Sequence, residues 1–383
     1  MEIVKYKDSD YESLVAFMRI NWSQEHAIYN KELFDWQYRI DENGLSESLL
    51  LIDKGCIEGF LGVIPGKYSS NGEQYKGISF AMWIVSEKYR NSGLGIMLMK
   101  EAEKYNSVCL TLGCNFQVVP MYERMGYSYS DHLNRYVIPL DVNGYVKLLK
   151  DPADQASISQ WLSDVEGKLI HSYSPILNIT GEELERLYVK SIQHRFSLSQ
   201  YRSASFWEWR YINSAGYKYL FFGDSTAEGI VVARLDRVYA PEESIHGTKV
   251  LRIIEIIPAN ADVWEGIADH RLIEMVSGVL SWARNQGCVA ADFQLSSNRL
   301  EHVLESIGFR KQNIDYTPKE CGLAGLFQPF RYRVNPINFV WKIKNNEGYF
   351  QNTEVNNMYL VKTDGDMDRP NIWPLPKGWN NNG

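Results

Sequence analysis

One short segment constrains this chain more than any other. The apolar run Ile78–Val85 has the composition of a buried strand, and apolar residues recur with helical spacing from Ile96 to Tyr105. Between them lies Arg-Asn-Ser-Gly-Leu-Gly at 90–95. A strand, a glycine-bearing loop and a helix start direct unpaired backbone N–H groups at one point, where the helix dipole favours an anion. The segment predicts a pyrophosphate-binding site, because glycines let the backbone approach a phosphate closely.

The details of the loop exclude two common phosphate-binding motifs. No Gly-Lys-Ser/Thr ends it, so it is not a P-loop, and its two glycines do not have the dinucleotide-binding spacing. Arg-x-x-Gly-x-Gly after a strand resembles the acyl-CoA loop of the GNAT N-acyltransferase superfamily. Arg90 occupies the first position of this motif, and Gly93 and Gly95 occupy the fourth and sixth. The helix that follows is expected to expose Lys100, Glu101, Glu103 and Lys104 to water.

A second motif follows at the distance found in that family. Val108–Leu112 is expected to be a strand; Asn115 comes after it, and Tyr122-Glu-Arg-Met-Gly-Tyr lies on a short helix. This pattern resembles the second GNAT motif, in which the tyrosine lies near the CoA sulfur and protonates the leaving thiolate. The resemblance assigns that role to Tyr122. An aromatic side chain that anchors the helix in the core is the structural alternative.

Composition limits the class of protein. The chain has 383 residues, 45% hydrophobic content and a formal charge of −7, which suits two domains without a basic surface for nucleic acid. No apolar run approaches the roughly 20 residues of a membrane span, and the N-terminus does not resemble a signal peptide. Five cysteines without CxxC pairs predict reduced thiols, no metal site and a cytoplasmic protein.

The chain also repeats itself. Residues 33–38 (Leu-Phe-Asp-Trp-Gln-Tyr) recur at 206–211 (Phe-Trp-Glu-Trp-Arg-Tyr), an offset of 173 (209 − 36). The same offset carries the run at 78–85 onto 251–258, which indicates an internal duplication. We therefore expect an α/β (α+β) fold with two tandem GNAT-like domains, each a mixed, mainly antiparallel sheet flanked by helices. The expected segments are a GNAT domain at 1–140, a connector at 141–180, a degenerate GNAT-like domain at 181–319 and a C-terminal extension at 320–383.

The second copy lacks the chemical motifs. No Arg-x-x-Gly-x-Gly follows Pro258; Asp262 and Glu265 would repel a pyrophosphate there, and Leu304 occupies the position that matches Tyr122. CoA should therefore bind only the first copy. The resemblance implies a cofactor-binding set made of the strand end, the loop and the following asparagine: Trp83, Ile84, Val85, Arg90, Asn91, Ser92, Gly93, Leu94, Gly95, Ile96 and Asn115.

The resemblance implies transfer of an acyl group from acyl-CoA to an amine by direct attack on the thioester. Backbone N–H groups of Trp83–Val85 would stabilise the oxyanion, and Tyr122 would protonate the sulfur. Many family members use a glutamate on the strand as general base, but Ile78–Val85 has no acidic residue. The candidates for the base are His26, Glu255, Asp366, Asp368, or a water molecule.

The tail segment 363–371 carries alternating aspartates followed by Arg369. It fails the EF-hand pattern, since it has no glycine at position six and no glutamate at position twelve. It is either a polar surface turn or a loop whose carboxylates and arginine fold onto the substrate cleft.

Tandem architecture with one active copy resembles acyltransferases of bacterial surface-glycan synthesis, which act on nucleotide-linked amino sugars. This predicts such a sugar as acceptor, contacted by Trp36, His26 and Arg369, and allows a homodimer. Three alternatives remain: peptidoglycan aminoacyltransferases, which use aminoacyl-tRNA; mycothiol synthase, whose active copy is usually C-terminal; and a non-catalytic acyl-CoA sensor.

Overall fold

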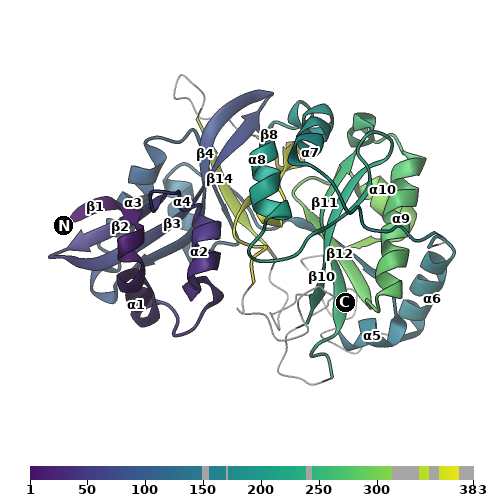
Figure 1. Cartoon of the computed structure of the whole chain (residues 1–383), viewed down its shortest axis with the longest axis horizontal. Helices are drawn as coiled ribbons and strands as arrows, with labels where there is room; N and C mark the ends of the chain where they lie inside the picture. Colours follow the sequence, from purple (N-terminus) through teal and green to yellow (C-terminus); the bar gives the residue numbers. More distant parts are fainter. Residues whose placement is uncertain (149–154, 170, 239–243, 313–335, 345–352, 371–383) are drawn as a thin grey trace. The chain divides into compact units, whose positions relative to one another are not determined.

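The computed structural model describes residues 1–148, 155–169, 171–238, 244–312, 336–344 and 353–370. These residues form two compact units, each built on a sheet flanked by helices (Figure 1). The first unit contains the described parts of Met1–Asp131, Ile337–Thr353 and Lys362–Leu375; the second contains those of His132–Pro336 and Glu354–Val361. Each unit therefore combines segments that are distant in sequence, and the predicted mixed α/β class is confirmed.

The first unit places its strands in the order β1-β2-β3-β4-β5-β14-β6. All neighbours are antiparallel except β4 and β5, which are parallel. Its strands are β1 (Glu2–Lys7), β2 (Leu45–Asp53), β3 (Cys56–Ser70), β4 (Glu73–Val85), β5 (Val108–Leu112), β6 (Ser128–Ser130) and β14 (Phe339–Ile343). Its helices are α1 (Tyr11–Asn21), α2 (Lys31–Tyr38), α3 (Leu94–Glu103) and α4 (Val119–Arg124).

Side-chain alternation along the strands assigns helices to the two faces of this sheet. Leu49, Leu51 and Leu61 pack in one cluster with residues of α3 and with Tyr122 of α4. Phe60, which points the other way, contacts the rings of Phe34 and Tyr38 on α2. Helices α3 and α4 thus cover one face, and α2 covers the other (Figure 1). Burial of each large apolar side chain stabilises the unit by about 1.5–3 kcal/mol.

The strand beside β5 comes from outside the predicted first domain at 1–140. Within that segment, β7 (Asn134–Pro139) pairs with β12 and β13 in the sheet of the second unit. The position next to β5 is taken by β14, from the C-terminal part of the chain. Both strands are apolar and short, so local pattern alone does not distinguish the sheets to which they belong.

An ion pair fastens β14 to α3. Glu103, which was expected to face water, is 7% exposed. Its carboxylate accepts hydrogen bonds from Nζ of Lys342 on β14 (2.8 Å) and from the hydroxyl of Tyr127 (2.7 Å). Lys342 also donates to the carbonyl of Met125 (2.8 Å). The expectation that Glu103 faces water is wrong, because β14 and the chain after α4 cover that side of the helix.

The second unit contains a sheet in the order β13-β7-β12-β11-β10-β9 and a short parallel pair, β8–β15. Only β11 and β12 are parallel neighbours within the sheet. Its other strands are β8 (Leu198–Gln200), β9 (Leu220–Asp224), β10 (Gly229–Arg237), β11 (Lys249–Pro258), β12 (Ala290–Leu295), β13 (Arg310–Lys311) and β15 (Met358–Tyr359). Its helices are α5 (Val142–Lys147), α6 (Gln155–Glu166), α7 (Gly181–Tyr188), α8 (Ala204–Trp207), α9 (His270–Asn285) and α10 (Glu301–Ile307).

A β-bulge recurs at the offset of the sequence repeat. In the β3–β4 ladder, Gly62 and Val63 pair with Met82 and Phe80, so Ala81 is the extra residue. In the β10–β11 ladder, Val232 and Ala233 pair with Glu255 and Ile253, so Ile254 is extra. The two bulges are 173 residues apart (254 − 81), which is the offset of the aromatic repeat. The duplication therefore extends to the local geometry of the central strand.

No helix of the described ranges is long and apolar enough to cross a membrane. Cys56, Cys109, Cys114 and Cys288 are free thiols, and Cys321 lies outside the described residues.

Replacement of Glu103 by glutamine should destabilise the protein. The change leaves the ammonium of Lys342 without its buried counter-charge, so we expect the free energy of unfolding to fall by about 3–5 kcal/mol. Lys5→Met is the control, because Lys5 forms an exposed pair with Glu47 (3.1 Å) and should change stability by about 1 kcal/mol or less. Urea denaturation measures both; similar small changes would contradict a structural role for the buried pair.

Candidate functional site

The centre of the candidate site is the point where β4 and β5 separate. They are paired only along Gly77–Ser79 and Val108–Leu110. Beyond these residues β4 runs on to Val85 and β5 to Leu112. The bulge at Ala81 lies where the strands part, and bends β4 there. In the described register, β4 is therefore not paired with β5 beyond Ser79. The backbone N–H and C=O groups on that edge of β4 can then bind a ligand.

The loop predicted to bind pyrophosphate leads into α3 through a glycine. Gly93 is the N-cap of α3 with φ +85°, a left-handed conformation that favours glycine. A Cβ at this position would meet nothing within 4 Å, so the space above the helix start is open. Gly95, in the first turn, lies against the indole of Trp83; a Cβ there would approach Cζ2 of that ring to 2.5 Å. The two glycines thus serve different purposes, one conformational and one steric.

The other predicted loop residues surround this helix start. Ile84 and Val85 end β4 and pair with β3; Leu94 and Ile96 belong to the first turn of α3. Arg90 is exposed and its guanidinium donates to the carbonyl of Asn21 (3.3 Å). Asn91 is exposed with φ +62°. The hydroxyl of Ser92 donates to the carbonyl of Tyr89 (2.6 Å), which braces the loop.

Tyr122 lies on the α3 face of the sheet, near the separation of the strands. It is 2% exposed and its ring packs against Trp83 (6.4 Å between centroids) and Tyr127 (5.2 Å). Burial raises the pKa of Tyr122 above its usual range, so the phenol stays protonated at neutral pH. Asn115 caps the turn before α4, where its side chain accepts from the N–H of Gln117 (2.9 Å).

The tail segment folds onto the first unit, on the face opposite Tyr122. Gly365 packs against Leu112 and Ser79, which alternate with residues of the α3-face cluster and so point away from it. Asp366 is 6% exposed and Asp368 is fully buried. The segment is therefore not a simple exposed turn.

Two predicted substrate-binding residues meet there. Nη1 of Arg369 lies 3.1 Å from Nε2 of His26. Nε of Arg369 donates to the carboxylate of Asp366 (3.1 Å). Asp368 pairs with Lys362 (3.7 Å). Burial raises the pKa of Tyr38 on α2 above its usual range, and the Asp366 carboxylate adds to the shift. The third predicted residue, Trp36, lies on α2 and is 9% exposed.

Glu255 lies in the second unit and is committed to structural contacts. It is fully buried, and its carboxylate accepts from Arg202 (2.8 Å), Tyr211 (2.6 Å) and Tyr359 (2.5 Å). Both oxygens of this carboxylate are engaged by charge-assisted or phenolic hydrogen bonds within the second unit. This arrangement disfavours Glu255 as the general base.

In the second copy, a side chain of the protein occupies the N-terminus of the corresponding helix, α9. Asp269 is the N-cap of α9, and its carboxylate accepts from the N–H of Arg271 (3.0 Å). Asp262 and Glu265, expected to repel a pyrophosphate, instead pair with Arg195 (3.3 and 3.6 Å). The anion position of α9 is thus filled by a residue that sequence analysis had not singled out.

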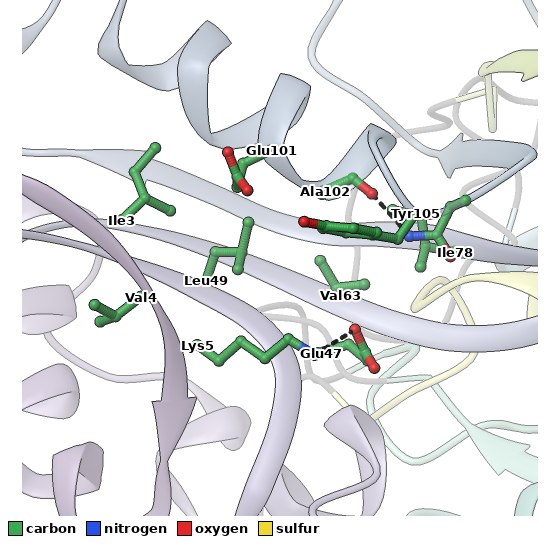
Figure 2. Close-up of a pocket in the computed structure, with 11 residues that line it drawn as sticks. Ile3, Val4, Lys5, Glu47, Leu49, Val63, Ile78, Glu101, Ala102 and Tyr105 are labelled. Atoms are coloured by element: carbon green, nitrogen blue, oxygen red, sulfur yellow. Dashed lines mark hydrogen bonds and ion pairs between the residues drawn. The ribbon is translucent and has the colours of Figure 1, made fainter.

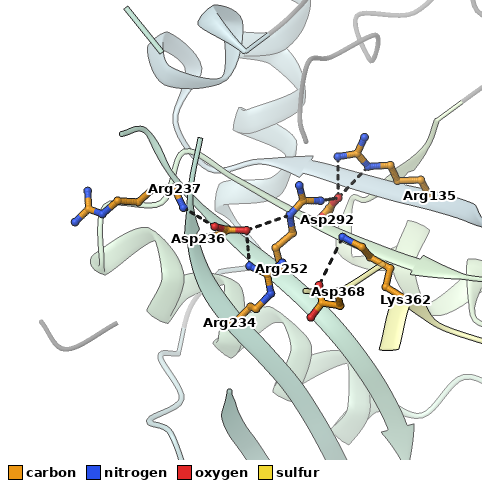
Figure 3. A network of polar contacts seen from close by, with 8 residues as sticks. All are labelled: Arg135, Arg234, Asp236, Arg237, Arg252, Asp292, Lys362 and Asp368. Atoms are coloured by element: carbon orange, nitrogen blue, oxygen red, sulfur yellow. Dashed lines mark hydrogen bonds and ion pairs between the residues drawn. The ribbon is translucent and has the colours of Figure 1, made fainter. Parts of the chain in front are cut away.

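Buried charges also line the central strands of the second sheet (Figure 3). Asp292 accepts from Arg135 (2.9 Å) and from Arg252, and Asp236 accepts from Arg234. These five side chains are at most 5% exposed. Buried ion pairs are weak stabilisers compared with apolar packing, so such a polar face is unusual for a structural core.

A separate cavity of about 200 Å³ lies in the first unit, at the C-terminal end of α3 (Figure 2). Its floor is formed by Leu49, Val63 and Ile78, and its rim includes Lys5 and Glu47. None of the predicted site residues lines it. Among the described residues, no group of three or more His, Cys, Asp or Glu side chains is arranged to hold a metal ion.

Comparison with known proteins explains the first unit. Residues 11–127 match the acetyltransferase (GNAT) family. The chain contains a GNAT acetyltransferase domain. This family assignment confirms the prediction of a CoA-dependent N-acyltransferase, because the matched residues include both the loop at 90–95 and Tyr122. No curated protein matches the chain.

Solved structures share the fold over nearly the whole chain. Saccharomyces cerevisiae N-myristoyltransferase with bound myristoyl-CoA is 12% identical with a TM-score of 0.52, covering 93% of this chain and 83% of that one. A probable N-acyltransferase of Enterococcus faecalis V583 is 12% identical with a TM-score of 0.54, covering 89% and 72%. A GCN5-related N-acetyltransferase from Anabaena variabilis is 12% identical with a TM-score of 0.52, covering 89% and 72%. At this identity the likeness shows the fold alone: two GNAT-like halves, as the duplication predicted.

Sequence analysis missed the bulge at Ala81 and the contacts of Ser79, Gly365 and Met367. A bulge adds one residue to a strand and leaves no mark in an apolar run. The position of a tail loop depends on the strand that precedes it. Only the clustering of Asp366, Asp368 and Arg369 hinted at a site.

Gly93 at the start of α3 and Gly266, which ends the turn before α9, offer a matched test of CoA binding. Gly93 and Gly266 both have left-handed φ (+85° and +88°), and a Cβ at either would meet nothing within 4 Å. Glutamate at either position should therefore cause similar backbone strain, about 1–2 kcal/mol. We expect Gly93→Glu to weaken CoA binding at least about tenfold, since it places a carboxylate at the helix start, and Gly266→Glu to leave it unchanged. Calorimetry decides; equal affinities for the two variants would reject the loop assignment.

Proposed function

We propose that this protein transfers an acyl group from acyl-CoA to the primary amine of a nucleotide-linked amino sugar, in the cytoplasm, during bacterial surface polysaccharide synthesis. The observation that carries the acyl-transfer site is the separation of β4 from β5 after Ser79, between the start of α3 and Tyr122 on one face and a carboxylate-bearing loop on the other. Acyl-CoA enters from the α3 face, with its pyrophosphate at Gly93 and its sulfur near Tyr122.

The reaction requires one proton to leave the amine and one to reach the sulfur. The neutral amine attacks the thioester carbonyl carbon, and backbone N–H groups of β4 beyond the bulge stabilise the oxyanion. The C–S bond breaks, and Tyr122 protonates the departing thiolate. Asp366 or Asp368 accepts the proton released by the nitrogen. The products are an amide and CoA, and the enzyme gains its rate mainly by orienting amine and thioester.

The acceptor is assigned on chemical grounds. The tail loop presents two carboxylates and Arg369 beside His26 on the face opposite Tyr122, which suits a polar, cationic amine. Guanidinium groups favour diphosphates and carboxylates, so Arg369 supports a phosphate-bearing sugar over an apolar amine.

A thiol-release assay tests the function. Acetyl-CoA and longer acyl-CoAs are offered with a panel of nucleotide-linked amino sugars, amino-sugar thiol precursors and short peptides with free amines. Release that depends on one nucleotide-linked sugar supports the proposal. Release that depends on another amine would replace the nucleotide-linked sugar as the assigned acceptor. Tight acyl-CoA binding without release on any amine would favour a non-catalytic acyl-CoA sensor.

Tyr122→Phe should lower kcat about 10²–10⁴-fold without changing the Kd for acyl-CoA, because only the hydroxyl that protonates the thiolate is lost. Since burial raises the pKa of Tyr122 above its usual range, the phenol remains a proton donor at least up to pH 10. We therefore expect no alkaline loss of kcat in the wild-type protein below pH 10 from this group. Full turnover by Tyr122→Phe would exclude the assigned role.

The proton acceptor is identified by three matched changes in one loop. Asp366→Asn and Asp368→Asn each remove a carboxylate, and Asp364→Asn, at a third buried aspartate, controls for effects on the loop. We expect one of the first two variants to lose about 10²–10⁴ in kcat. Equal losses for all three would indicate a structural role, and no loss would favour water as the acceptor.

A further inference from the structure

The tail loop also occupies the space into which an acyl group would extend. Beyond Ser79 and Leu110 the strands β4 and β5 are no longer paired with one another in the described register. Tyr122 closes the α3 face of this opening. Gly365 lies on the other face, against the last residue of β5, and Met367 lies against Gly113, the glycine after it. A group attached to a sulfur beside Tyr122 and directed away from α3 therefore points at these two residues.

The packing on that face is tight. A Cβ on Gly365 would lie 3.1 Å from Cδ1 of Leu112 and 3.2 Å from Oγ of Ser79. The side chain of Met367 contacts the α-carbon region of Gly113, where any Cβ would overlap its sulfur. Ser79 is fully buried and Leu112 is 2% exposed. Residues packed at this density admit an added methylene only if neighbours shift.

The other face offers no alternative route through the described core. Phe80, Cys109, Tyr122 and Tyr127 fill it as members of one buried cluster with α3. The cavity at the C-terminal end of α3 is lined by other members of the same layer, Leu49, Val63 and Ile78, and lies at the far end of α3 from Gly93. A long chain would have to displace this cluster to reach it.

We propose that Gly365 and Met367 are specificity-determining residues that limit the length of the acyl group, so that the protein uses short acyl-CoAs. This inference rests on the proposed function, since it takes the thioester to lie beside Tyr122. In this respect the protein would differ from the yeast N-myristoyltransferase that shares its fold and was solved with myristoyl-CoA.

Calorimetry with CoA, acetyl-CoA, butyryl-CoA and octanoyl-CoA tests the inference without knowledge of the acceptor. The wild-type protein should bind acetyl-CoA and CoA with similar Kd and octanoyl-CoA at least tenfold more weakly. Met367→Ala removes the bulky side chain and should restore octanoyl-CoA binding to within about threefold of acetyl-CoA. Gly365→Ala should weaken butyryl-CoA more than acetyl-CoA, because its added methyl group faces Leu112 and Ser79. The control is Leu177→Ala, at a 93% exposed residue of the second unit, which should change none of these affinities.

The outcomes separate the two proposals. If free CoA itself does not bind, the CoA site of the proposed function is wrong. If CoA binds but octanoyl-CoA binds the wild-type protein as tightly as acetyl-CoA, only the length limit is overturned. If octanoyl-CoA is discriminated against but Met367→Ala and Gly365→Ala leave the series unchanged, other residues set the limit and the assignment to the tail loop fails.

Discussion

The separation of two parallel strands is the constraint on which the site in the first unit depends. In a regular parallel pair, the two strands hydrogen-bond to one another along their whole length. β4 and β5 share only three residue pairs before they separate. The bulge at Ala81 marks this point. Every feature assigned to chemistry is placed relative to it: the glycine loop continues from the end of β4, Tyr122 covers one face, and the tail loop covers the other.

A strand from the C-terminal part of the chain also joins the first unit. β14 adds to the free edge of β5, and the buried pair of Lys342 with Glu103 holds it against α3. An ion pair of this kind contributes little net stability compared with apolar packing, but it penalises any arrangement that leaves one partner alone. It therefore favours this strand over another apolar segment at the same edge. The tail loop at Lys362–Pro370 then adds carboxylates to a unit in which the segment Ile78–Val85 of β4 has none.

The two copies share the geometry of the central strand and differ where the next helix begins. The bulge of β4 recurs in β11 at the offset of the aromatic repeat, yet the helix that follows begins differently. Gly93 leaves the start of α3 open, whereas Asp269 caps α9 with its own carboxylate. The same helix dipole that can bind an anion from solution is satisfied internally in the second copy. Its central strands instead carry buried arginines and aspartates.

The sequence by itself determined the local elements and the glycine loop at 90–95. Strand and helix periods and the spacing from Arg90 to Tyr122 depend on neighbours in the chain, so they can be read from it. It also determined that only one copy retains the loop. The tertiary structure decided which sheet received Asn134–Pro139, that Glu103 is buried, and that the tail loop meets His26 and Ser79. All three features depend on which distant segments of the chain pair at the edge of a sheet. An apolar strand has the same sequence pattern whichever sheet it joins, so the pattern does not decide between them.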